Sequence, residues 1–228
     1  MSMTENEAPV MRRGLFVTFE GGDGSGKTTQ IRKLIMRLKF LNFPVLETAE
    51  PGGPPIGQQI RRILLDPANK DMNPTAELLL YFASRAQNVN QWILPALENG
   101  KVVVCDRFTD STLVYQGHGR GLGERPVREL HRIACGALQP DVTIYLDIDL
   151  ETALARAHAR NQASSGPAET RMDEQSVEFH RAVRNAYLSL ARKEPRRIIV
   201  VDARPDAETV ERHIWNTLAP HLEALRAR

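Results

Sequence analysis

Short apolar runs alternate with segments of helical periodicity along most of the chain. The apolar runs predict β-strands at 15–20, 44–48, 101–105, 142–148 and 198–202. Between them, apolar residues recur at steps of three and four over about 31–41, 57–65, 75–99, 126–138 and 177–190. Strands that alternate with helices imply a parallel sheet covered on both faces. The pattern therefore predicts an α/β fold with a five-stranded parallel sheet.

The 75–99 segment is the longest helical pattern and carries two stripes. Its apolar stripe consists of Leu78, Phe82, Val89 and Ile93. Its second stripe mixes a phenol, a guanidinium, an amide and an indole: Tyr81, Arg85, Asn88 and Trp92. Taken alone, such a stripe indicates an ordinary boundary between core and solvent. Pro95 is expected to kink or loosen the last turn.

The length and composition limit the classes of protein to consider. The chain has 228 residues, enough for one well-buried domain, which we expect over 14–222 between a disordered leader (1–13) and a tail (223–228). Its 30 basic and 28 acidic side chains give no global field for nucleic acid or an anionic membrane. Two cysteines in apolar surroundings and the lack of any membrane-spanning run predict a cytoplasmic protein.

The first predicted strand runs directly into a glycine-rich segment. Its residues are Gly21, Gly22, Asp23, Gly24, Ser25, Gly26, Lys27, Thr28 and Thr29, which match the pattern G-x-x-x-x-G-K-[ST]. In this pattern backbone amides cradle phosphates, the lysine neutralises them and the threonine hydroxyl ligates Mg²⁺. The alternative, a flexible glycine-rich hairpin, leaves Lys27 and Thr28 unexplained. We therefore expect an ATP-binding cradle here.

Further polar residues follow other predicted strands. Asp23, Glu50, Asp106 and Arg107 each come at or just after a strand, so they should converge at one edge of the sheet. Asp106 occupies the place expected of a carboxylate that organises magnesium. The glycine-rich loop 116–123 lacks the spacing of a dinucleotide fingerprint, and we expect it to be flexible.

Residues 156–173 form a candidate lid. Arg156, Arg160 and Arg171 flank a stretch of small and polar residues. Without the cradle, a solvated loop with ordinary surface charge would be the simpler interpretation. With the cradle, arginines on a lid suit phosphoryl transfer, because they stabilise the charge that moves between phosphates. The guanine signature N-K-x-D is absent, which favours a nucleotide kinase over a GTPase switch.

Three segments resemble the thymidylate kinase family, and the resemblance extends over about 14–222. They are 106–117 (DRFTDSTLVYQG), 50–53 (EPGG) and 76–85 (AELLLYFASR), the first being highly specific. The resemblance implies a three-layer α/β/α P-loop NTPase fold with an arginine-bearing lid. It also implies transfer of the ATP γ-phosphoryl group to dTMP with Mg²⁺, and a homodimer.

Roles carry over from the family residue by residue. Tyr81 is expected to stack on thymine, Arg85 to bond the base, Arg107 to clamp the dTMP phosphate, and Tyr115 to pack against C2′ of the sugar. Asp23 matches the carboxylate that orients the 3′-hydroxyl and the metal. The remaining expected positions are Glu50, Ser111, Thr112 and Gln116 for dTMP, Arg156 and Arg160 for catalysis, and Thr28 and Asp106 for the metal.

The chain also departs from the family pattern. Ala49 replaces a common arginine, Pro54 a threonine, and Thr112 a frequent asparagine. Because Gly24 stands where some members carry a cradle arginine, the lid must supply that cation. Two other interpretations remain open: a kinase of another monophosphate such as dUMP or dGMP, and a phosphate-loop switch protein without an acceptor.

Overall fold

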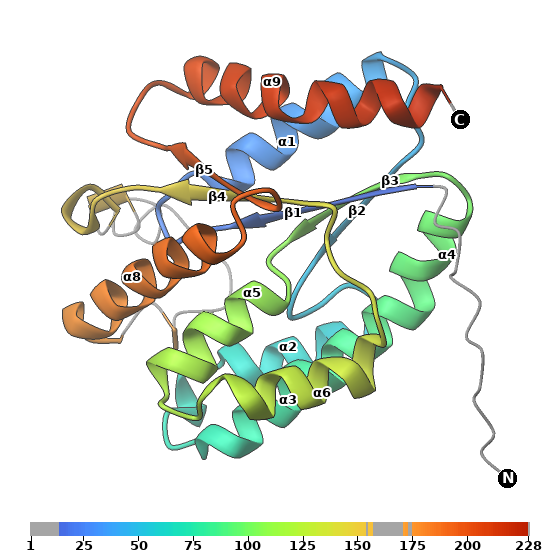
Figure 1. The fold of residues 1–228 in the computed structure, drawn as a ribbon. Coiled ribbons are helices and arrows are strands. Elements are labelled where there is room, and N and C mark those ends of the chain that lie inside the picture. Colours follow the sequence, from blue (N-terminus) through green and yellow to red (C-terminus); the bar gives the residue numbers. More distant parts are fainter. Residues whose placement is uncertain (1–13, 154, 157–170, 173–174, 228) are drawn as a thin grey trace, which may run out of the picture.

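The structure, a computed structural model, is a twisted five-stranded parallel sheet between two layers of helices (Figure 1). It describes residues 14–153, 155–156, 171–172 and 175–227. The strand order is β2-β3-β1-β4-β5, with β1 in the centre. The strands are β1 Leu15–Glu20, β2 Val45–Ala49, β3 Val102–Asp106, β4 Val142–Asp147 and β5 Ile198–Asp202. All five lie where the apolar runs predict them, to within a residue at either end.

The described helices follow the strands in alternation. They are α1 Lys27–Phe40, α2 Pro55–Leu65, α3 Pro74–Asn88, α4 Leu94–Glu98, α5 Thr109–Thr112, α6 Glu124–Cys135, α8 Val177–Lys193 and α9 Ala207–Arg226. In the described part of the chain, every helix is too short or too polar to span a lipid bilayer.

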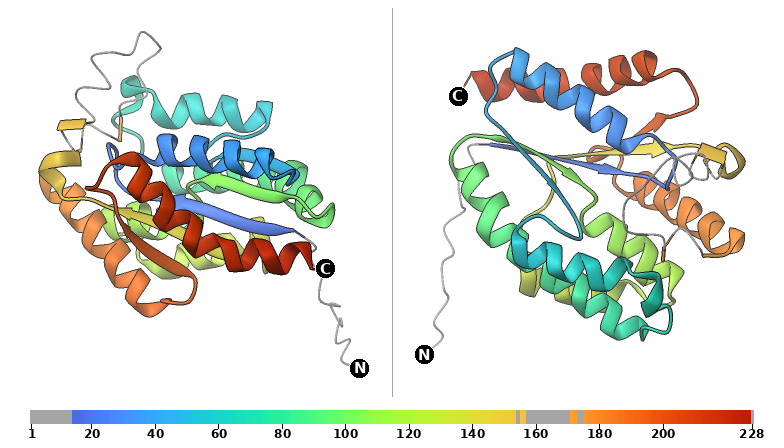
Figure 2. Two further views of the ribbon diagram at one scale, coloured as in Figure 1. Left: turned by 90° about the horizontal axis from the view of Figure 1, so that it is seen from above. Right: turned by 180° about the vertical axis from the view of Figure 1, so that it is seen from behind.

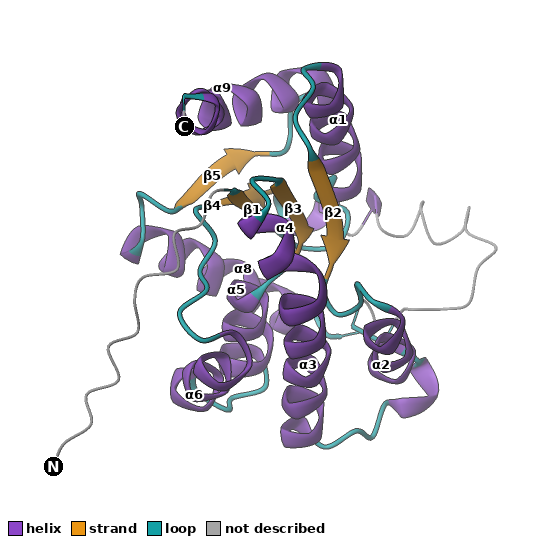
Figure 3. Cartoon of the chain, turned by 90° about the vertical axis from the view of Figure 1, so that its right-hand side faces the viewer, coloured by secondary structure: helices purple, strands orange, loops and turns teal. Residues whose placement is uncertain are grey.

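The two faces of the sheet are covered by different helices. Helices α1 and α9 lie side by side over one face, and α3, α4, α5, α6 and α8 lie beneath the other (Figures 1 and 2). The alternation of β1 explains this, since successive strand residues point to opposite faces. Leu15, Val17 and Phe19 pack with the buried face of α1 and α9, whereas Phe16 packs beneath with Phe108. Figure 3 shows the same layers turned by 90°, with β5 at the left and β2 at the right of the sheet.

Helix α9 is not among the predicted elements. It begins at Asp206, whose carboxylate accepts hydrogen bonds from the amides of Glu208 and Thr209, at 3.1 and 2.9 Å. Its buried side chains recur every fourth residue: Val210, Ile214, Leu218 and Leu222. The helix continues to Arg226, so the expected tail at 223–228 is helical over most of its length. The expected leader, 1–13, lies outside the described residues.

Two segments differ in detail from the periodic pattern. The predicted 75–99 helix is divided by a π-helical segment, Val89–Ile93. Pro95 accounts for it, because proline lacks the N–H that would bond the carbonyl four residues earlier, so the expected loosening is confirmed. The expected flexible loop 116–123 is wrong in its first half. Residues Leu113–Gly119 form a π-helical segment that buries Gln116 and Gly117.

Candidate active site

Three segments lie at the carboxyl edge of the sheet: the cradle, the β2–α2 turn and the segment after β3. Residues 21–26 connect β1 to α1, and three of their glycines, Gly21, Gly24 and Gly26, have positive φ. At Gly24 a Cβ would lie 2.1 Å from the carbonyl oxygen of Ala153. An arginine at this position has no room, which accounts for the departure from family members that carry one.

Lys27 lies inside the cradle. It is 7 % exposed, and its Nζ donates to the carbonyl oxygens of Gly21 and Gly22, at 2.9 and 3.1 Å. Burial lowers the pKa of Lys27, and the positive charge of Arg107 lowers it further. The first turn of α1 contains no acidic residue, and Gly26 before it has no side chain to cap the amides. A phosphate would satisfy both the amides and the lysine.

Arg107 connects the cradle with the segment that follows β3. Its Nη2 donates to Oδ1 of Asp23 at 3.2 Å, and its Nη1 lies 3.4 Å from the hydroxyls of Ser111 and Tyr115. About a fifth of the side chain is exposed. The predicted convergence of Asp23 and Arg107 is therefore present in the structure.

A second cluster, next to the β2–α2 turn, surrounds Arg85 of α3. The Arg85 side chain is 1 % exposed; its Nε donates to Oε2 of Glu50 at 2.5 Å and its Nη2 to Oγ1 of Thr112 at 2.9 Å. Asn88 donates to the other oxygen of Glu50, at 3.1 Å. Arg85 and Asn88 of the second stripe thus belong to a buried polar cluster. Nη1 of Arg85 is buried and makes no hydrogen bond within the described residues.

The side chains expected to bind dTMP differ in their surroundings. Tyr81 is half-buried on α3, one turn before Arg85. Glu50 accepts hydrogen bonds from Arg85 and Asn88, so both of its carboxylate oxygens are bonded within the protein. The other three donate or accept within the protein: Ser111 with Glu20 at 2.5 Å, Thr112 with Arg85 at 2.9 Å, and Gln116 with Glu77 at 2.8 Å.

The three lid arginines have separate environments. Arg156 is exposed and its Nη1 donates to the carbonyl oxygen of Ala203, after β5, at 3.2 Å. Arg160 lies outside the described residues, as does most of the expected lid. Arg171 is 3 % exposed and its Nη2 lies 2.7 Å from Oε2 of Glu77 on α3. The expectation that Arg171 is available to transferring phosphates is therefore wrong, because a buried carboxylate neutralises it.

The two expected metal ligands lie on neighbouring elements. Thr28 is exposed in the first turn of α1, and Asp106 ends β3. Oδ1 of Asp106 is buried and has no hydrogen-bond partner within the described residues. An unpaired carboxylate oxygen, on a residue whose charge acts on Lys27 of the cradle, fits Mg²⁺, which prefers oxygen ligands and takes several of them from phosphates and water.

Glu20, the last residue of β1, is a site residue that the sequence analysis misses. It is completely buried; its Oε1 accepts from the amide of Phe108 at 2.8 Å, and its Oε2 accepts from Ser111 and Tyr187 at 2.5 and 2.7 Å. Burial and the nearby charge of Asp110 raise its pKa to about 7. A carboxylate at the end of a buried central strand is the signal that could have identified it.

The raised pKa of Glu20 predicts a pH-dependent stability. Between its ordinary pKa of 4.5 and about 7, Glu20 keeps its proton in the folded chain but loses it in the unfolded chain. The unfolded state then binds fewer protons, so this residue makes stability fall as pH rises through that window. Relative to Glu20→Gln, the wild-type unfolding free energy should decrease by on the order of 3 kcal/mol between pH 4 and 8. Urea denaturation measures this; parallel pH profiles of the two proteins would contradict it.

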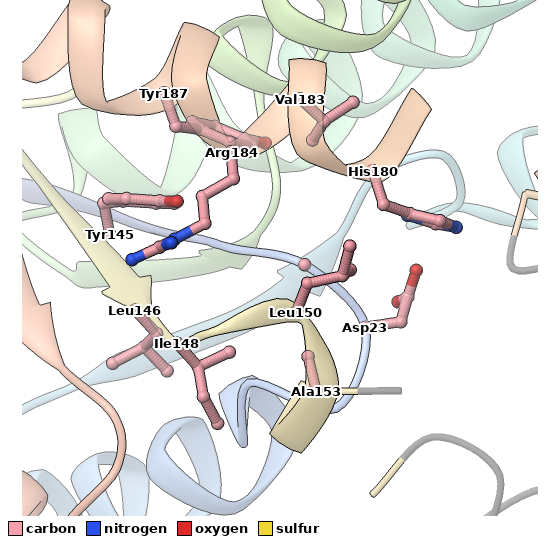
Figure 4. Close-up of a pocket in the computed structure, with 11 residues that line it drawn as sticks. Asp23, Tyr145, Leu146, Ile148, Leu150, Ala153, His180, Val183, Arg184 and Tyr187 are labelled. Atoms are coloured by element: carbon pink, nitrogen blue, oxygen red, sulfur yellow. The ribbon is translucent and has the colours of Figure 1, made fainter. Parts of the chain in front are cut away.

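A pocket lies between the cradle and α8 (Figure 4). It contains about 530 Å³ of empty space that is partly open to solvent. Asp23 and His180 lie together on one side of it, whereas Arg184 forms a two-point ion pair with Asp147, at 2.7 and 2.9 Å. The pocket therefore places one face of α8 beside the phosphate cradle.

Comparison with known proteins identifies relatives of this chain. The family model described as thymidylate kinase matches residues 19–214. The chain is 49 % identical to a thymidylate kinase of Pelobacter propionicus, with 88 % of this chain and 92 % of that protein covered. It is 50 % identical to one of Syntrophotalea carbinolica, with 91 % and 96 % covered. A crystal structure of thymidylate kinase from Ehrlichia chaffeensis has a TM-score of 0.72 and 31 % identity, covering 90 % of this chain and 98 % of that chain.

Proposed function

The chain belongs to the thymidylate kinase family. We propose that the residues at the carboxyl edge of its sheet transfer the γ-phosphoryl group of ATP to dTMP, giving dTDP and ADP. The observation that carries the proposal is the contact between Arg107, after β3, and Asp23, in the cradle, at 3.2 Å. This contact connects a donor site and an acceptor site at a single point on the sheet edge.

The cradle is the ATP side of this site. Backbone amides of Gly21–Thr29 and the N-terminus of α1 would hold the donor phosphates. In the structure Lys27 donates to carbonyl oxygens of the cradle, and we propose that the β- and γ-phosphates replace those acceptors. The buried hydroxyl of Ser25, which has no hydrogen-bond partner in the described chain, is a further donor for a phosphate.

The clusters around Arg85 and Tyr115 are the dTMP side. The free Nη1 of Arg85 is a donor for a thymine carbonyl, and Glu50 and Thr112 fix the orientation of that guanidinium. Tyr81 would stack on the base from the same helix. Tyr115, whose hydroxyl lies 3.4 Å from Arg107, would pack against the deoxyribose at C2′ and leave no room for a ribose hydroxyl.

The reaction needs alignment more than proton transfer. The dTMP phosphate is the nucleophile, and near neutral pH it is already ionised. Arg107 would hold its oxygens with a planar two-point contact, while Lys27 holds the donor phosphates in line with them. Arg156 and Arg160 would add positive charge as the phosphoryl group moves. Asp23 accepts from Arg107 and would orient both it and the 3′-hydroxyl.

We assign Mg²⁺ to Thr28 and Asp106. The unpaired buried oxygen of Asp106 and the exposed hydroxyl of Thr28 are the protein groups that would hold the ion. When bound, it would neutralise charge on the phosphate oxygens.

A panel of acceptors tests the function. In a coupled assay of ADP release, dTMP should give the highest kcat/KM among dTMP, dUMP, dGMP and the ribonucleotide of thymine. Without an acceptor, ADP release should be slow, because no phosphate is held by Arg107. A preference for dUMP or dGMP, or ADP release that dTMP does not accelerate, would reject the assignment.

We propose a homodimer formed through α3 and α6, which lie side by side beneath the sheet (Figure 3). Leu79 of α3 and Ile133 of α6 are 51 % and 74 % exposed. Sedimentation velocity should give twice the 25.6 kDa chain mass, and Ile133→Glu should give a monomer. Phe40→Glu, on α1 and 84 % exposed, is the matched control and should remain dimeric. A monomeric wild type would end this proposal.

We also place the enzyme in the cytoplasm. Cys105 and Cys135 are both free thiols, which suits a reducing compartment.

A further inference from the structure

Arg107 has an unusual backbone conformation. Its φ is +66°, in the left-handed region that residues with a side chain rarely adopt. Hydrogen bonds secure the backbone on both sides of it. The amide of Arg107 donates to the carbonyl oxygen of Phe19 at 2.9 Å, and its own carbonyl oxygen accepts from Sγ of Cys105 at 3.0 Å. The next amide, that of Phe108, donates to Oε1 of Glu20 at 2.8 Å.

Glu20 also reaches the side chain of Arg107 through Ser111. Oε2 of Glu20 accepts from the Ser111 hydroxyl at 2.5 Å, and that hydroxyl lies 3.4 Å from Nη1 of Arg107. Tyr187 of α8 donates to the same carboxylate oxygen at 2.7 Å and lies 2.9 Å from the Ser111 hydroxyl. One buried carboxylate therefore bonds both the backbone next to Arg107 and the hydroxyl beside its guanidinium.

We propose that Glu20 is the positioning residue that holds Arg107 in the conformation in which it clamps the acceptor phosphate, an inference that rests on the proposed function. Both carboxylate oxygens of the fully buried Glu20 are already bonded within the protein, by Phe108, Ser111 and Tyr187, so it acts on a substrate through other residues. A carboxylate suits this task, since it accepts several hydrogen bonds and donates none when ionised. An aliphatic side chain would leave the Phe108 amide unpaired in the core.

Glu20→Gln is the first test. Glutamine can still accept from the Phe108 amide, but its amide nitrogen cannot accept from the hydroxyls of Ser111 and Tyr187. At pH 8 we expect KM for dTMP to rise by about tenfold, as the loss of a hydrogen bond to a charged group implies, while KM for ATP changes less than about twofold. Thr18→Val is the matched control: Thr18 is a buried side chain on the same strand that bonds Thr143 at 2.8 Å, and both KM values should be unchanged.

A double-mutant cycle distinguishes positioning from a general structural role. If Glu20 acts through Arg107, then Glu20→Gln should weaken dTMP binding in the wild type but change it less than about twofold in an Arg107→Ala background. Calorimetric titration with dTMP measures all four proteins. Equal losses in both backgrounds would overturn the proposal, as would equal rises of both KM values.

Tyr187→Phe gives a second route should Glu20→Gln fail to fold. It removes one donor to the carboxylate and keeps the ring that stacks on Tyr145 at 4.7 Å. We expect a rise of a few fold in KM for dTMP alone, and an unchanged KM for dTMP would overturn the proposal. If Arg107→Ala itself leaves dTMP binding intact, the proposed function fails; if it weakens binding and the Glu20 and Tyr187 variants do not, only this inference fails.

Discussion

Arg107→Ala should lower kcat/KM for dTMP by roughly 10²- to 10⁴-fold, the range seen when a donor to transferring charge is removed. Arg107 is the cation that links the cradle aspartate to the hydroxyls of Ser111 and Tyr115. Alanine keeps the backbone but removes both donors from the acceptor phosphate. Steady-state kinetics with dTMP as the varied substrate measure the loss.

The fold should survive this substitution, because the hydrogen bonds around residue 107 come from its backbone and its neighbours. The melting temperature of Arg107→Ala is therefore expected to stay close to that of the wild type. Arg212→Ala, an exposed arginine on α9, is the control for loss of one positive charge and should have wild-type kinetics. Near-normal turnover in Arg107→Ala would contradict the assignment of the acceptor site.

Lys27→Ala should lower kcat by a similar two to four orders of magnitude, again with the chain folded. The lysine is buried in the cradle, where no other described lysine lies. Burial lowers its pKa, which means that the positive charge is unfavourable there while no ligand is bound. A phosphate group would compensate that unfavourable charge, so the ammonium contributes most when ATP is bound. Turnover at saturating ATP and dTMP measures the loss.

Lys33→Ala provides the matched control on the same helix. Lys33 is half-buried on α1 and forms an ion pair with the exposed Glu208 of α9 at 2.6 Å. Exposed pairs of this kind contribute little, so activity should remain within about twofold of the wild type. Equal losses in both lysine variants would indicate damage to α1 rather than to the phosphate site.

Local signals were sufficient for the sheet and the cradle. Each strand is a short apolar run, and the cradle depends on residues that are neighbours in sequence, so both can be predicted without knowing the tertiary structure. Parallel strands bring their carboxyl ends to one edge, which also explains why Asp23 and Arg107 were expected to meet. The roles of Tyr81 and Arg85 came instead from the family resemblance.

The surroundings of Glu20 and Arg171 could not be predicted from local sequence patterns. The partners of Glu20, namely Phe108, Ser111 and Tyr187, are 88, 91 and 167 residues away along the chain, so no local pattern could connect them. Arg171 belongs to a segment of small and polar residues that suggested solvent exposure, yet Glu77 on α3 neutralises it in the interior. Only the packing of distant elements determines whether such a charge is buried.

A crystal structure of the protein soaked with dTMP tests the central claim most directly. We predict that the phosphate contacts the guanidinium of Arg107 beside Asp23, and that the thymine lies between Tyr81 and the free Nη1 of Arg85. Binding of dTMP in a cavity remote from Arg107 would contradict the account.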